Sequence, residues 1–308
     1  MNQAEVDESS VLLDGDWTHR FVSANGHRFH VAEAGAGPLV LFLHGFPEFW
    51  WAWRHQLPAV AEAGFRAAAM DLRGYGASDK PPRGYDPSTL AADVAGVIRS
   101  LGARDAVVVG HGWGGLVAWT AAVAAPGQVR RIAAVSMAHP RRLRLAHLTD
   151  PQQLKASRHI IGFQRPVVPE RHLVADDGAL VGHLLHLWSR PGWPDAETEQ
   201  RYRQMVQIPG VAHCALESYR WAIRSLPRPD GLRYARRMRT PVAVPTLHVH
   251  GAIPGPVLPS SAQGSSRYVD APYRWRLLPG VGHFPHEEDP VMFNEELIGW
   301  LNDPEPDR

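Results

Sequence analysis

Short apolar runs rich in Val, Leu and Ala alternate along the chain with longer segments in which apolar residues recur at helical spacing. Strands that are apolar on both faces are typical of a mostly parallel sheet covered by helices on both sides, so we predict an α/β fold. The predicted strands are residues 17–22, 28–32, 39–43, 66–70, 106–109, 132–136, 246–250 and 275–278. The predicted helices are residues 53–63, 88–101 with Ser88 as N-cap, 115–125 and 290–301.

The alternation stops over residues 140–239, a segment rich in Arg, His and Leu with helical spacing and several prolines. We predict that this segment is a helical cap, or lid, inserted after the sixth strand. Residues 1–139 and 240–308 would then form the core. A chain of 308 residues is long enough for one such domain with an insertion.

The composition of the chain excludes several classes of partner and site. The 32 Lys and Arg nearly balance the 31 Asp and Glu, and no long block of one sign occurs, which argues against nucleic acid or a membrane as partner. Cys214 is the only cysteine, so an intrachain disulfide and a cysteine zinc site are excluded. The polar start MNQAEVDESS does not resemble a signal peptide, and no apolar run reaches about 18 residues. We expect a cytoplasmic protein that binds a small hydrophobic molecule, and the sequence leaves a homodimer open.

Two features of the sequence resemble cofactor sites. Seventeen histidines are mostly scattered and form no HExxH pair, so no metal is expected. Residues 110–115, GHGWGG, satisfy the dinucleotide fingerprint after an apolar strand, and Arg130 or Arg131 could meet a 2′-phosphate. Earlier strands precede this fingerprint, however, and no carboxylate follows at the expected distance. We expect no cofactor.

Four separated motifs carry a family resemblance: HGFPE at 44–48, DLRGYGASD at 71–79, GHGWGG at 110–115 and GVGHFPHEEDP at 280–290. In this order they resemble soluble epoxide hydrolases, which are close cousins of haloalkane dehalogenases. The resemblance implies the α/β-hydrolase fold, with a mostly parallel eight-stranded sheet and a lid. The family's nucleophile elbow reads GHDWGG, so Gly112 stands where the catalytic aspartate is expected.

The resemblance also implies the other roles. The family's aspartate attacks an epoxide carbon to form an ester, and a histidine-activated water hydrolyses it. His283 matches that histidine, although a buried histidine without a catalytic role is the alternative reading. The backbone N–H groups of Phe46 and Trp113 match the oxyanion hole.

Most of the remaining candidates lie in the lid. Tyr219 matches one of the two family tyrosines that protonate the leaving oxygen, and His159 occupies the place of the other. Trp50 and Phe163 are candidates for the wall of the substrate pocket. For each of these the alternative is plain aromatic packing.

A second departure from the family lies in LHVHGAIPGPVLP, where Ile253 and Pro254 stand in place of the aspartate that orients the histidine. Ser136 and Ala138, after the sixth strand, offer no substitute carboxylate. Three hypotheses follow: an epoxide hydrolase relative whose covalent mechanism is disabled, an acid–base enzyme such as a lyase, cyclase or isomerase that uses His283, Tyr219 and His159, and a non-catalytic binding protein.

Overall fold

Strands β3 (Leu39–Leu43) and β5 (Ala106–His111) are buried at every position, because they lie in the middle of a sheet with helices on both faces. The computed structural model describes residues 6–304 and contains an eight-stranded sheet in the order β1-β2-β4-β3-β5-β6-β7-β8. β2 pairs antiparallel with β1 and β4, and all other neighbours are parallel. The predicted α/β class and mostly parallel sheet are therefore confirmed.

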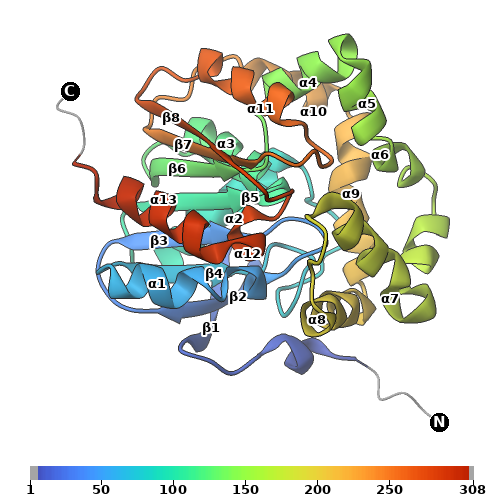
Figure 1. The fold of residues 1–308 in the computed structure, drawn as a ribbon, viewed down its shortest axis with the longest axis horizontal. Coiled ribbons are helices and arrows are strands. Elements are labelled where there is room, and N and C mark those ends of the chain that lie inside the picture. The colour runs from blue at the N-terminus through green and yellow to red at the C-terminus, as the bar shows by residue number, and fades with distance from the viewer. Residues whose placement is uncertain (1–5, 305–308) are drawn as a thin grey trace.

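The other strands are β1 (Thr18–Ala24), β2 (His27–Ala34), β4 (Arg66–Met70), β6 (Val129–Val135), β7 (Thr246–Gly251) and β8 (Tyr273–Leu278). The helices of the core are α1 (Gln56–Glu62), α2 (Pro87–Ser100), α3 (Trp113–Ala124), α11 (Pro259–Gln263), α12 (Pro285–Glu288) and α13 (Pro290–Asn302), with short 3-10 turns η1 (Glu8–Val11), η2 (Trp50–Trp53) and η3 (Gly264–Tyr268). Figure 1 shows α1 and α13 in front of the sheet and α2 and α3 behind it.

Seven helices lie between β6 and β7, and we call them the lid: α4 (Pro140–Thr149), α5 (Pro151–Ala156), α6 (His159–Gly162), α7 (Val168–Trp188), α8 (Ala196–Gln207), α9 (Val211–Arg224) and α10 (Pro229–Arg237). They pack along one end of the sheet, on the right in Figure 1. The ring of Tyr219 on α9 contacts Phe46, which follows β3, and the carbonyl of Trp188 on α7 accepts the N–H of His283, which follows β8. The lid therefore covers the carboxyl ends of the strands.

Two local predictions need correction. The N-cap of α2 is Asp86, whose carboxylate accepts the N–H groups of Ser88 and Thr89, because Pro87 suits the first helical position and the preceding residue then becomes the cap. The helix predicted from residue 53 is divided, since residues 50–53 form a 3-10 turn and α1 begins at Gln56.

No helix among residues 6–304 combines the length and the apolar character needed to cross a membrane. Residues 1–5, part of the polar start from which the absence of a signal peptide was predicted, lie outside the described residues.

Candidate active site

Gly112 stands at the turn between β5 and α3, with φ 50° and ψ −119°. This backbone conformation is unfavourable for residues other than glycine. The room for a side chain differs between the glycines of this turn. A Cβ on Gly110 would overlap the carbonyl oxygen of Gly114, whereas a Cβ on Gly112 would meet only the Gly45 Cα at 3.6 Å and the Nε2 of His283 at 3.7 Å. The turn therefore has room for a side chain at residue 112, and that side chain would point towards His283.

The backbone of His283 is held by hydrogen bonds on both sides, whereas its imidazole has no hydrogen-bond partner among the described residues. Its N–H donates to the Trp188 carbonyl at 2.8 Å, and its carbonyl lies 2.8 Å from the Nε2 of His111. The buried Nδ1 has no partner. Burial lowers the pKa of His283 well below its usual value, and the charges of His111 and His250 add to this effect. The imidazole is therefore neutral near pH 7.

Within residues 6–304, no carboxylate bonds to the imidazole of His283. Ile253 donates its N–H to the Val281 carbonyl at 2.9 Å, and Pro254 is exposed. A Cβ on Gly255 would lie 3.6 Å from the Nδ1 of His283 and 3.1 Å from its Cβ. Sequence reasoning missed Gly255, since nothing in the motif distinguishes it from its neighbours.

The two predicted oxyanion donors lie beside the elbow. Phe46 follows Gly45, whose Cα is 3.6 Å from the Cβ position of Gly112, and Trp113 is the first residue of α3. Among the described residues, neither N–H donates to a carbonyl or to a side chain. Both groups remain available to an acceptor in the site.

Beneath the elbow lies a buried network that sequence reasoning did not identify. One oxygen of Glu48 accepts the N–H of Gly45 at 2.7 Å and lies 2.6 Å from the Nδ1 of His111, and the other oxygen lies 3.1 Å from the Nε2 of His286. Burial by itself raises the pKa of Glu48, but the charges and hydrogen bonds of the two histidines outweigh it and hold this pKa well below its usual value. Glu48 thus fixes the loop that carries Phe46.

The same network has the residue types of a metal site. The ligand atoms of Glu48, His111 and His286 lie within 4.8 Å of one another. The carbonyl of His283 can only accept, so the Nε2 of His111 carries a hydrogen, and its Nδ1 shares a further proton with Glu48. A metal ion would have to displace this short contact. The contact between Glu48 and His111 is therefore satisfied by a shared proton.

Aromatic side chains from the lid close over the elbow. The ring of Tyr219 lies 4.9 Å from that of Trp113 and 5.5 Å from that of Phe46, and Phe163 lies 5.1 Å from Tyr219. His159 lies 5.7 Å from Tyr219, and burial lowers the pKa of His159 to about 4. Burial raises the pKa of Tyr219. Both groups are uncharged near pH 7, in an apolar surrounding.

The structure does not bring Trp50 to this cluster. Its ring packs against Trp17, His19 and His30, and its indole N–H donates to the Val11 carbonyl at 2.7 Å. Trp50 is therefore a core residue near the N-terminal strands.

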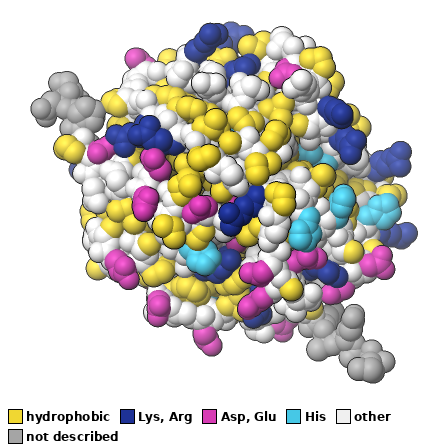
Figure 2. All heavy atoms as spheres, viewed as in Figure 1, with side chains coloured by type: hydrophobic (Ala, Val, Ile, Leu, Met, Phe, Trp, Pro, Cys, Tyr) yellow, Lys and Arg dark blue, Asp and Glu magenta, His cyan; other side chains and the backbone are white. Residues whose placement is uncertain are grey.

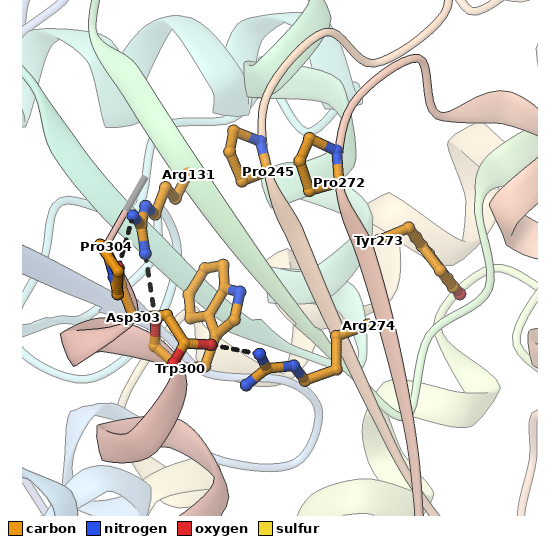
Figure 3. Close-up of a pocket in the computed structure, with 8 residues that line it drawn as sticks. All are labelled: Arg131, Pro245, Pro272, Tyr273, Arg274, Trp300, Asp303 and Pro304. Atoms are coloured by element: carbon orange, nitrogen blue, oxygen red, sulfur yellow. Dashed lines mark hydrogen bonds and ion pairs between the residues drawn. The ribbon is translucent and has the colours of Figure 1, made fainter. Parts of the chain in front are cut away.

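The two arginines of the nucleotide interpretation also lie elsewhere. Arg130 pairs with Asp105, and Arg131 donates to the carbonyls of Trp300 and Asp303. Arg131 lines a surface cavity of about 430 Å³ at the end of the sheet where β7 and β8 begin, opposite the end that carries Gly112. Figure 3 shows Arg131 beside Asp303 and Pro304. Neither arginine can reach a ligand bound at the elbow.

Comparisons with known proteins agree with the fold. A family described as the alpha/beta hydrolase fold matches residues 38–290. The mouse protein named epoxide hydrolase 4 is 32% identical over 93% of this chain and 80% of its own length, and epoxide hydrolase A of Mycobacterium tuberculosis is 29% identical over 92% and 97%. The solved structure of an epoxide hydrolase from an endophytic Streptomyces covers 94% of this chain and 96% of its own, with a TM-score of 0.78 and 29% identity.

Proposed function

This chain belongs to the α/β-hydrolase fold family and is epoxide hydrolase-like, and from that premise we propose that its site binds a small hydrophobic molecule bearing an acceptor oxygen, while the covalent mechanism is disabled. The observation that carries the proposal is Gly112 at the elbow, facing the Nε2 of His283 with no atom that could attack.

The missing groups correspond to the two chemical steps. Ester formation needs a nucleophile at residue 112, and the loss of a nucleophile that works as part of a unit costs about a millionfold in turnover. Ester hydrolysis needs a base whose tautomer is fixed. The Nδ1 of His283 has no partner, and loss of the orienting carboxylate costs about 10⁴ in rate in serine proteases.

The groups that remain favour binding. Phe46 and Trp113 offer backbone N–H donors, and Tyr219 offers a neutral phenol above them. Their surroundings are aromatic and largely shielded from water, which suits a neutral apolar body with one polar atom.

Turnover of styrene oxide tests the proposal. The wild type should show no turnover above background. Gly112→Asp should form the alkyl ester, visible as a mass increase of the protein, and hydrolyse it slowly. Gly112→Asp with Gly255→Asp should add turnover, because the second carboxylate would reach the Nδ1 of His283. Gly112→Asn is the matched inactive control, and wild-type turnover comparable to that of the double variant would refute the proposal.

A second candidate function is acid–base catalysis without a covalent intermediate. It is supported by three titratable groups around one aromatic cluster: His159 contacts Tyr219 and Trp188, and Trp188 in turn contacts His283. A neutral imidazole can accept a proton and a phenol can donate one. If an isomerase or lyase activity were found, His283→Ala should abolish it, and an unchanged rate would exclude this role.

A further inference from the structure

A Cβ on Gly112 would make only ordinary van der Waals contacts, and its position adjoins the first turn of α3, a 12-residue helix whose N-terminus faces the site. The N–H groups at a helix N-terminus and the helix dipole favour an anion. In a chain with a carboxylate at residue 112, that carboxylate would belong to the protein. Here the donors remain, and the side chain is absent.

We propose that the carboxylate of a small hydrophobic carboxylic acid occupies this space, with its apolar body beneath the lid. The inference rests on the proposed binding function and specifies the class of ligand. The ligand's carboxylate would take the place that an aspartate side chain on residue 112 would fill, and no covalent step is involved.

His283 is the independent observation that points to a ligand. Its side chain is 5% exposed, and its Nε2 lies 3.7 Å from the position of a Cβ on Gly112. This nitrogen bonds to no described residue, in contrast to the nitrogens of His111, which both have partners. The fully buried nitrogen without a partner among the described residues is Nδ1, whereas Nε2, on the side of Gly112, is free to bond to a ligand. With its hydrogen on Nε2, His283 would donate to a carboxylate oxygen.

The neighbouring charges permit an anion here. The nearest acidic side chain of the network, Glu48, is already compensated by the Gly45 N–H and by His111 and His286. No carboxylate contacts the His283 ring among residues 6–304. A ligand carboxylate would thus meet donors from Phe46, Trp113 and His283 without an opposing negative group.

The aromatic side chains around the elbow determine which apolar group the ligand can carry. Phe46, Phe163, Trp188 and Tyr219 are each at most 5% exposed, and their rings surround the elbow from the loop after β3 and from the lid. Such walls suit an arylalkyl or medium-chain alkyl group. A doubly charged acid would bury an unpaired charge and should bind weakly.

Binding of matched acids and amides tests the inference in the full-length protein. Phenylacetate, 4-phenylbutyrate and octanoate would be compared with the corresponding amides by calorimetry and tryptophan fluorescence. We expect at least one acid to bind ten or more times more tightly than its amide. Equal affinity of acid and amide, or failure of every acid to bind, would overturn the inference.

Two variants at one position separate charge from volume. Gly112→Asp places a protein carboxylate in the space and should weaken acid binding at least a hundredfold, whereas Gly112→Asn fills nearly the same volume without charge and should weaken it less. Circular dichroism and Tm would establish that both fold. If Gly112→Asp bound the acids as well as the wild type does, the carboxylate would lie elsewhere.

The styrene oxide assay keeps the two proposals apart. A wild type that hydrolyses epoxides would refute the proposed function. A wild type that does not hydrolyse epoxides, and that binds amides as tightly as acids, would refute only the carboxylate inference.

Discussion

The elbow motif requires glycine for two different reasons, and the difference decides how residue 112 should be interpreted. Gly110 and Gly114 are surrounded by backbone atoms that a Cβ would overlap, so packing requires glycine at both positions. A Cβ on Gly112 would make only ordinary van der Waals contacts, at 3.6 Å and 3.7 Å, so only the positive φ of Gly112 favours glycine. The residue that packing does not fix is the one on which the chemistry depends.

Gly112→Ala should reduce the free energy of unfolding by about 1 to 2 kcal/mol, because the backbone strain appears without a steric clash. Urea unfolding monitored by circular dichroism would measure it. Gly102→Ala is the matched control, since Gly102 has φ 79° and nothing within 4 Å of its Cβ position. If Gly112→Ala lost much more unfolding free energy than Gly102→Ala, the inference that a Cβ fits beside His283 would be contradicted.

Sequence motifs could locate the residues whose place in the fold depends only on the residues next to them in the chain. Gly112, Trp113 and Phe46 stand at the turns where their motifs predicted them, since each turn directly follows a buried strand. The proximity of Gly255 to His283, and the contacts of Glu48 with His111 and His286, depend on how distant segments approach in space. No local pattern encodes such distances, and the position of Trp50 could not be predicted for the same reason.

At the scale of elements, the central strands were the easiest to predict. The bounds of β3 and β4 match the predicted ranges, because continuous apolar runs begin and end abruptly there. Four lid helices, α4, α5, α6 and α10, have ten residues or fewer, so hydrophobic spacing did not define their ends. One side chain from α9 makes several of the contacts that hold the lid segment after α6.

That side chain is Arg220, which is 3% exposed. Its guanidinium donates to the carbonyls of Phe163 and Arg165 and pairs with Glu170 at 2.6 Å. Because Phe163 packs on Tyr219, this contact connects the backbone after α6 to the aromatic wall of the site.

Arg220→Met should loosen the lid without unfolding the core. Removing one partner of a buried ion pair costs about 3 kcal/mol. Hydrogen exchange should accelerate over residues 159–170 and stay unchanged in β3 and β5, and ligand affinity should fall about tenfold. The control is Arg224→Met, which removes one exposed hydrogen bond to the Gln164 carbonyl and should have a smaller effect. Uniform acceleration over the whole chain would show that Arg220 stabilises the core instead.

For the whole molecule, buried histidines make stability depend on pH. Burial lowers the pKa of His139 to about 3 and that of His250 and His286 to about 4, whereas an unfolded histidine has a pKa near 6.5. As pH falls below about 6.5, the unfolded chain binds protons that the folded chain excludes, so the free energy of unfolding decreases by up to about 1.4 kcal/mol per pH unit for each group.

Glu287 acts in the opposite direction over part of this range. Burial raises its pKa to about 7, so between about pH 4.5 and 7 the folded chain holds a proton that the unfolded chain releases. One carboxyl group does not outweigh three histidines, and stability should fall from pH 7 to pH 5. Urea unfolding at several pH values checks the slope. His250→Gln should reduce it, and a stability that rises from pH 7 to pH 5 would contradict the assignment.

Charge is distributed unevenly between the lid and the rest of the chain. Residues 140–239 carry 17 Lys and Arg against nine Asp and Glu, whereas the remaining residues carry 15 against 22. Figure 2 shows Lys and Arg along the right-hand edge of the molecule, where Figure 1 places lid helices. The near-neutral total conceals a positive end that covers the site. A field of this kind raises the encounter rate of small anions and is screened by salt.

The association rate of a carboxylic acid ligand should therefore fall about tenfold between 10 mM and 500 mM salt, because the Debye length shrinks from about 30 Å to a few ångströms. The rate for the matching amide should hardly change, and stopped-flow tryptophan fluorescence measures both. Arg158→Glu and Arg236→Glu reverse two exposed lid charges and should reduce the acid's rate at low salt only. Since these residues lie outside the site, an equal salt dependence for acid and amide would mean that the lid's charge does not guide the ligand, even if the carboxylate binds at Gly112.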